Sequence, residues 1–110
     1  MAHAISTITD KDGKIQIPEW QPTSLSQNVR DLIEKLPLPK GPTIDLYWGD
    51  RTLTPQERIF GWNAFAILAM ESGVPAAPVN AIAGKARATC QLRFVVGTNE
   101  TDILPALRRH

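Results

Sequence analysis

The clearest pattern in the chain is a strict alternation of side chains between residues 85 and 96. Small or apolar residues occupy every second position, and charged or polar residues fill most positions between them. The apolar set is Ala86, Ala88, Cys90, Leu92, Phe94 and Val96. Because successive side chains of a strand point to opposite faces, this pattern predicts a β-strand with one covered face and one open polar face.

Two segments carry helix-start signals. Ser24 and Gln27 have the spacing of a capping box, and an apolar stripe follows them. The stripe consists of Val29, Leu32, Ile33 and Leu36. Further along, Thr54 suits an N-cap, Pro55 the first turn and Glu57 the third helical position. We therefore predict an amphipathic helix over 24–36 and a short helix from Thr54 that Gly61 limits.

The two ends of the chain also have helical spacing. Ala4, Ile5 and Ile8 precede a turn over 10–14, where Gly13 can adopt a positive φ. Near the other end, capping residues at 98–102 precede an apolar set at helical spacing, which is Ile103, Leu104 and Leu107. We interpret both ends as cuts through helices.

Prolines divide the rest of the chain into short elements. Pro37, Pro39 and Pro42 open an irregular excursion over 37–51 that contains Tyr47 and Trp48. The apolar run over 62–70 satisfies either a strand or a helix, because a run this short does not fix the period.

Composition places the chain among ordinary globular proteins. It has 110 residues, a formal charge of +1, 21% charged residues and 43% hydrophobic residues. One domain or a piece of one is expected at this length, and the balanced charge disfavours nucleic-acid binding. The longest apolar run, Ala64 to Met70, is far shorter than the roughly 20 residues of a membrane helix, and no secretion signal precedes it. We expect a soluble, cytoplasmic protein with no membrane association.

Candidate catalytic groups are few. The sequence has one cysteine, Cys90, and two histidines, His3 and His110, which cannot supply a zinc site. Asp10, Asp12 and Gly13 lack the spacing of a calcium loop and indicate a turn instead. Cys90 lies on the apolar face of its strand, so we expect a buried, inert thiol. We predict no catalytic residue and no metal ligand in this chain.

Three short segments nevertheless resemble a known family. They are PVNAI at 78–82, GKARA at 84–88 and LRFVVG at 92–97, with 13 residues between Asn80 and Arg93. The segments and their spacing resemble the lid, or dimerisation, domain of the two-zinc aminoacylase, acetylornithine deacetylase and carnosinase metallopeptidases. A weaker likeness over 2–18, 62–73 and 98–110 extends it to about two-thirds of the chain. Ala83 departs from the usual proline, and 24–54 has no counterpart in the commonest members.

The resemblance implies a fold and a function. It favours a strand near 63–71 and an α+β, ferredoxin-like sandwich with helices on one face of an antiparallel sheet. The sandwich would be incomplete at both ends, and an irregular insertion would span about 19–54. The single domain over 1–110 would then be a non-catalytic lid segment of a zinc-dependent exopeptidase or amidohydrolase.

In such a parent enzyme, the resemblance assigns substrate binding to Arg93, for a free carboxylate, and to Asn80, for another polar group. Two zinc ions, or other divalent metals, would belong to a separate catalytic domain, so this chain itself would hydrolyse nothing. The implied partners are that catalytic domain, a second copy of the lid and a small peptide or N-acyl amino acid.

An alternative from another class stays open. The chain could be a free-standing α+β module that binds a small molecule or another protein through the open face of its sheet. Flanking His-x-Asp and Glu-Glu elements in the same reading frame would favour the lid, and their absence would favour the module.

Overall fold

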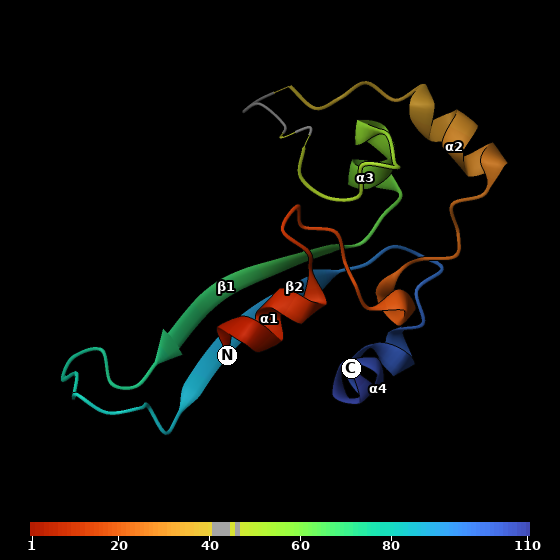
Figure 1. Cartoon of the computed structure of the whole chain (residues 1–110). Coiled ribbons are helices and arrows are strands. Elements are labelled where there is room, and N and C mark those ends of the chain that lie inside the picture. The colour runs from red at the N-terminus through yellow and green to blue at the C-terminus, as the bar shows by residue number, and fades with distance from the viewer. Residues whose placement is uncertain (41–44, 46) are drawn as a thin grey trace.

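The computed structural model describes residues 1–40, 45 and 47–110. Its elements, in chain order, are α1 (Ala2–Ile8), η1 (Pro18–Trp20), α2 (Gln27–Glu34), α3 (Pro55–Phe60), β1 (Ala64–Ser72), β2 (Ala86–Arg93), η2 (Glu100–Asp102) and α4 (Ile103–Arg109). The prefix η marks a 3₁₀ turn. Within the described part of the chain, this is an α+β structure built on one two-stranded antiparallel sheet (Figure 1).

The sheet is a long ribbon formed by β1 and β2. Its register runs from Ala64 opposite Arg93 to Ser72 opposite Ala86. The strand prediction for 85–96 is confirmed over its central part, and the ambiguous run over 62–70 is a strand. β2 ends at Arg93 because the Val95 N–H donates to the Asn63 side chain instead of to β1.

A register shift between Ile67 and Ala69 leaves one extra residue in β1. This extra residue shifts the alternation of β1 by one position, so that Met70 lies on the same face as Ile67. The resulting apolar face carries Phe65, Ile67, Met70, Ala88, Cys90 and Leu92, as the register requires. The opposite face carries Glu71 from β1 and Arg87, Thr89, Gln91 and Arg93 from β2.

The core covers only one end of the apolar face. It consists of Ile8, Ile15, Ile17, Trp20 and Ala106, and Phe65, Leu92 and Ile103 pack against it. The Trp20 and Phe65 rings lie 5.7 Å apart, and the Trp20 indole N–H donates to the Ile103 carbonyl at 2.9 Å. We call this region, together with the adjoining Asn63, the packed end.

The rest of the apolar face is largely open. We call residues 67–90 the outer ribbon. Here α1 lies beside Met70, and a shallow hollow separates them. Ile67 is 46% exposed and Met70 54% exposed, and Cys90 is also exposed. The expectations of a covered strand face and of a buried Cys90 are therefore wrong. The alternation in the sequence predicts the face on which a side chain lies, but not whether another element packs against that face.

The chain is correspondingly elongated. Its radius of gyration is 17.0 Å, whereas a closed domain of this length has about 13 Å. Figure 1 shows the ribbon projecting away from α2, α3 and α4.

The helices at the two ends of the chain follow the prediction closely. α1 and α4 contain the expected apolar residues, and Gly13 has a φ of 83° in the turn after α1. Pro105 lies in the first turn of α4, where it removes no helical hydrogen bond.

The two central helices agree with their signals to different degrees. Thr54 caps α3 by accepting the Glu57 N–H, and Gly61 ends that helix, as predicted. For α2, however, the cap is Ser26 and not Ser24. The Ser24 hydroxyl is engaged elsewhere, since it donates to the Val96 carbonyl.

The predicted stripe of α2 is only partly buried. Ile33 is buried, whereas Leu32 is 66% exposed. The helix packs chiefly on α3, where Arg30 pairs with the buried Glu57 at 3.1 Å. No helix in the described ranges is both long and apolar enough to cross a membrane.

Candidate functional site

Arg93 occupies the last position of β2, on the open face of the ribbon. Its strand partner is Ala64, its side chain is exposed, and its Nε donates to Gln91 Oε1 at 3.2 Å. A guanidinium offers a planar pair of N–H donors that matches a carboxylate. The position is therefore compatible with carboxylate binding from the solvent side of the sheet.

Asn80 lies in the connection between β1 and β2, at the far end of the ribbon, and is exposed. Seven steps of about 3.3 Å separate Ala86 from Arg93, which gives roughly 23 Å along β2 alone. Within one chain the structure therefore does not bring Asn80 and Arg93 together around a small molecule.

The backbone beyond Arg93 is fixed by a buried amide. Asn63 is 5% exposed, and its Nδ2 donates to the Trp20 carbonyl at 2.7 Å and to Thr98 Oγ1 at 2.9 Å. Its Oδ1 accepts the Val95 N–H at 2.9 Å. This one side chain thus ties η1 to the segment that follows β2, and holds Arg93 at a defined place. Sequence reasoning missed it, because its partners lie 32 to 43 residues away.

A second constellation forms where the excursion meets the turn after α1. We call residues 47–51 the strap and residues 10–14 the turn. Asp10 Oδ1 accepts the N–H groups of Asp12 and Lys14, both at 2.9 Å, which closes the turn. The strap then docks on it, since the Gly49 N–H donates to the Asp12 carbonyl at 2.6 Å.

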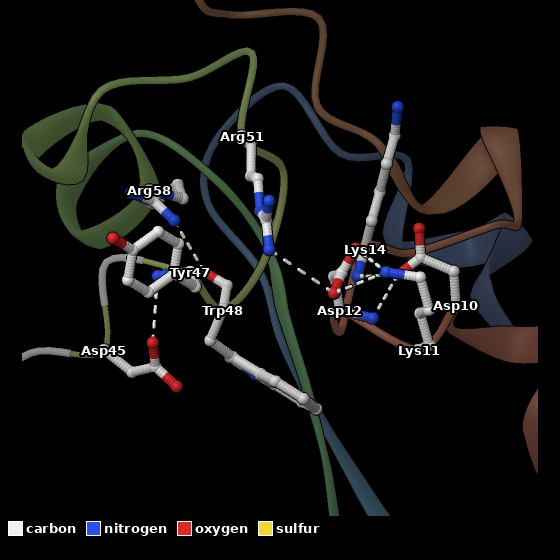
Figure 2. Close-up of polar contacts among 9 residues, drawn as sticks. All are labelled: Asp10, Lys11, Asp12, Lys14, Asp45, Tyr47, Trp48, Arg51 and Arg58. Carbon is white, nitrogen blue, oxygen red and sulfur yellow. Dashed lines mark hydrogen bonds and ion pairs between the residues drawn. The ribbon is translucent and has the colours of Figure 1, made fainter.

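Ion pairs and aromatic rings complete this contact. Arg51 lies 3.6 Å from the Asp12 carboxylate and 5.3 Å from the centre of the Tyr47 ring. Figure 2 shows Tyr47 and Arg51 on one side of the strap and the Trp48 indole extending away from them. The indole lies against Gly13, where a β-carbon would overlap it. Glycine at this position is required both by the positive φ and by the indole.

Asp50 anchors the strap from inside. It is 8% exposed, and its Oδ1 accepts the backbone N–H of Thr52 at 3.0 Å and the Thr52 hydroxyl at 2.6 Å. Lys14 Nζ lies 3.6 Å from Oδ2. Burial acts to raise the pKa of Asp50, but the Thr52 hydrogen bonds and the Lys14 charge outweigh it and hold that pKa below its ordinary value. The carboxylate is therefore ionised at neutral pH.

The pKa values of two half-buried carboxylates, Asp12 and Asp102, are also lowered, by other neighbours. The hydrogen bond from Lys11, assisted by the charges of Lys11 and Arg51, lowers the pKa of Asp12. Arg109 lowers the pKa of Asp102 through a two-pronged contact at 3.0 and 2.7 Å.

A cavity of about 110 Å³ lies between the strap and the start of β1. Trp48 and Trp62 contribute aromatic walls, and Lys14, Asp50 and Arg58 contribute charge. Arg58 Nη1 donates to the Trp48 carbonyl at 2.7 Å, which ties α3 to the strap. The sequence singled out Tyr47 and Trp48 but gave no sign that Trp62 and Arg58 would join Trp48. Pro42 and part of the 37–51 excursion lie outside the described residues.

In the ranges that the structure describes, no group of three or more His, Cys, Asp or Glu side chains is placed to hold a metal ion. No protein-family model, curated protein or solved structure matches the chain.

Proposed function

We propose that this chain is a non-catalytic lid and dimerisation segment of a zinc-dependent exopeptidase or amidohydrolase. The observation that carries the proposal is Arg93, an exposed guanidinium at the end of the open face of the ribbon. Strand pairing with Ala64 and the Asn63 hydrogen bond to Val95 fix its backbone. In this role Arg93 binds the free carboxylate of a dipeptide or N-acyl amino acid presented by the catalytic domain.

The catalytic domain supplies the chemistry in this proposal. Its two zinc or other divalent ions activate water for amide hydrolysis, while this chain binds and orients the substrate. The protein acts in the cytoplasm in this scheme, where a single unpaired thiol such as Cys90 is ordinary.

Subunit association is supported by the surface that the ribbon leaves open. Ile67 and Met70 are half exposed on the apolar face, and both ribbon edges lack strand partners within the described residues. An exposed strand edge is a template for pairing with another strand. Added strands and the facing helices would complete the ferredoxin-like sandwich.

Association would also bring the two proposed binding residues together. Antiparallel pairing of two β2 strands reverses their direction, so the loop end of one ribbon lies beside the Arg93 end of the other. Asn80 of one copy and Arg93 of the second copy would then share one substrate, which the roughly 23 Å span prevents within a single chain.

The test is the Arg93→Lys variant of the full-length protein that contains this segment. Lysine keeps the charge but loses the planar fork, so kcat/KM on a carboxylate-bearing substrate should fall about 10- to 100-fold. Arg87→Lys is the matched control, because Arg87 occupies the same face of the same strand, opposite Glu71. Its kcat/KM should change less than about twofold.

Zinc content and the unfolding midpoint should be the same in both variants and the parent. Equal kcat/KM for Arg93→Lys and the parent would refute the role of Arg93. A chain that sediments only as a monomer at high concentration would refute the dimerisation role.

A further inference from the structure

We propose that Gln91 is a positioning residue for Arg93 and that it makes the substrate site selective for a free carboxylate. The proposal rests on the proposed function, because it concerns the same open face of the ribbon. Gln91 and Arg93 lie two positions apart in β2, and Arg93 Nε donates to Gln91 Oε1 at 3.2 Å. The role of Gln91 follows from what this hydrogen bond does to the guanidinium.

The hydrogen bond sets the direction of the Arg93 side chain. Alternate residues of a strand lie about 7 Å apart on one face, so a contact between these two side chains requires them to lean toward each other. An Arg93 side chain that extended past the end of β2 could not reach Gln91. The guanidinium is therefore held over the open face of the ribbon.

The hydrogen bond also selects the donors that remain for a ligand. A guanidinium has five N–H groups, one on Nε and four on the two Nη atoms. Gln91 occupies the Nε–H, so the outer end of the guanidinium stays available. Among the residues that the structure describes, Arg93 forms no ion pair. The two Nη atoms can therefore donate in parallel to the two oxygens of one carboxylate.

The facing strand leaves this end of the guanidinium accessible. The partners of Arg93 and Gln91 on β1 are Ala64 and Ala66, and both are exposed. An alanine methyl group offers no hydrogen bond that could compete with Gln91 for the guanidinium. A substrate can therefore approach the Nη atoms from the solvent side.

The contact between Gln91 and Arg93 adds little to the stability of the fold. Both side chains are exposed, and they belong to the same strand, so each could bond to water instead. The backbone at Arg93 is held separately, by pairing with Ala64 and by the hydrogen bond from Val95 to Asn63. Removal of the Gln91 acceptor should therefore change how Arg93 binds, but not whether the chain folds.

A guanidinium held in one orientation discriminates between a carboxylate and a carboxamide. A carboxylate accepts from both Nη atoms at once, whereas a carboxamide presents one oxygen and one N–H group to them. A mobile guanidinium can turn to a single oxygen and loses part of this preference. Gln91 should therefore raise the ratio of kcat/KM for a free acid to kcat/KM for its amide.

The kinetic test uses the full-length protein that contains this segment. The probes are alanylalanine and N-acetylalanine, each compared with its C-terminal carboxamide. Gln91→Met keeps the length of the side chain but removes the acceptor, so the ratio of acid to amide should fall about 3- to 10-fold. Thr89→Val is the matched control, because Thr89 is the next residue on the same face, and its ratio should change less than about twofold.

A double variant shows whether Gln91 acts through Arg93. In the Arg93→Lys background, which lacks the Nε–H, Gln91→Met should change the ratio by less than about twofold. The unfolding midpoint should be the same in all variants. An unchanged ratio in Gln91→Met, or an equal loss in both backgrounds, would overturn the role of Gln91 while an impaired Arg93→Lys variant leaves the lid function standing. An unimpaired Arg93→Lys variant, or no hydrolysis of either free acid, would refute the proposed function and this role together.

An NMR measurement tests the hydrogen bond in the 110-residue chain without substrate. Arg87 is the internal reference, because it lies on the same face of the same strand and its side chain makes no hydrogen bond within the described ranges. The heteronuclear NOE of the Nε–H group should be higher for Arg93 than for Arg87, and the difference should vanish in Gln91→Met. Equal values in the parent chain would show that Gln91 does not orient Arg93 in solution, and would overturn the proposal whatever the kinetics.

Discussion

The packed end and the outer ribbon are built from the same kinds of residues but differ in what surrounds them. In the core the side chain of Ile17 is 0% exposed, whereas in the outer ribbon Ile67 is 46% exposed and Ile82 is fully exposed. The packed end also satisfies its polar groups internally, as Asn63 shows with three hydrogen bonds. The difference indicates that the packed end carries the stability of the chain, whereas the outer ribbon leaves apolar surface exposed, which is the surface that the proposed association would use.

The largest expected effect comes from replacing an isoleucine in the core and comparing it with an isoleucine in the outer ribbon. Ile17→Ala should lower the free energy of unfolding by about 2–5 kcal/mol, because it leaves a cavity in a fully buried site. Ile82→Ala should change it by less than about 0.5 kcal/mol. Urea denaturation at low protein concentration measures both. A similar loss for the two variants would show that residue 82 is buried in solution, for example in a dimer.

A glycine pair gives the next largest effect. Gly13→Ala should lower the free energy of unfolding by about 1–3 kcal/mol, because alanine disfavours a φ of 83° and its β-carbon would displace the Trp48 indole. Gly84→Ala is the control, since no atom lies within 4 Å of the added carbon and its φ is not positive. If the two variants unfold at the same urea concentration, the strap does not rest on the turn.

Acid should weaken the anchoring of the strap, which holds Asp50, more than it affects the outer ribbon, and this is the smallest of the three expected effects. The Asp50 pKa is held below its ordinary value of 3.8 in the folded chain, so its contribution is present above that value and is lost as the pH falls through the lower folded pKa. The free energy of unfolding should therefore decline below about pH 4.

Asp50→Asn should flatten that part of the decline, and Thr52→Val should flatten it partly, because it removes the hydroxyl that donates to Asp50. Unfolding curves collected between about pH 5 and pH 2.5 measure the slopes. Unchanged slopes in both variants would contradict the assigned environment of Asp50.

The sequence predicted local structure well wherever neighbouring residues determine it. Thr54, Pro55 and Glu57 specify the start of α3 through contacts within four residues, and the structure has that start. Likewise the alternation after Lys85 specified β2, and the turn at Gly13 was correctly predicted.

Predictions failed where distant residues compete for a group. Ser24 and Ser26 are both acceptable caps by local rules, and the Val96 carbonyl decides between them by binding the Ser24 hydroxyl across 72 residues. Cys90 shows the same limitation of local rules. Its position in the alternating pattern gives the face of the strand on which it lies, but its exposure depends on what packs against that face.

The candidate sites also differ in how far local sequence patterns could predict them. Arg93 and Asn80 rest on a motif in neighbouring segments, and their positions on the ribbon follow from the strand pattern, but their separation depends on the length of β2. The cavity between the strap and the start of β1 is lined by Gly13, Trp48, Arg58 and Trp62, among others, and no local rule connects these positions. Side chains that meet through tertiary docking leave no periodic signal in the sequence.

The contact between α4 and α1 has a consequence for protein engineering. His110 Nε2 lies 3.0 Å from the Thr7 carbonyl, so the last residue touches the helix that begins at Ala2. Seven residues of helix span only about 10 Å, which a short glycine-rich linker can bridge. The two ends could be joined covalently and the chain reopened in the exposed connection after Gly73. Such a circular permutant would keep the core contacts while making each strand of the ribbon a terminal segment.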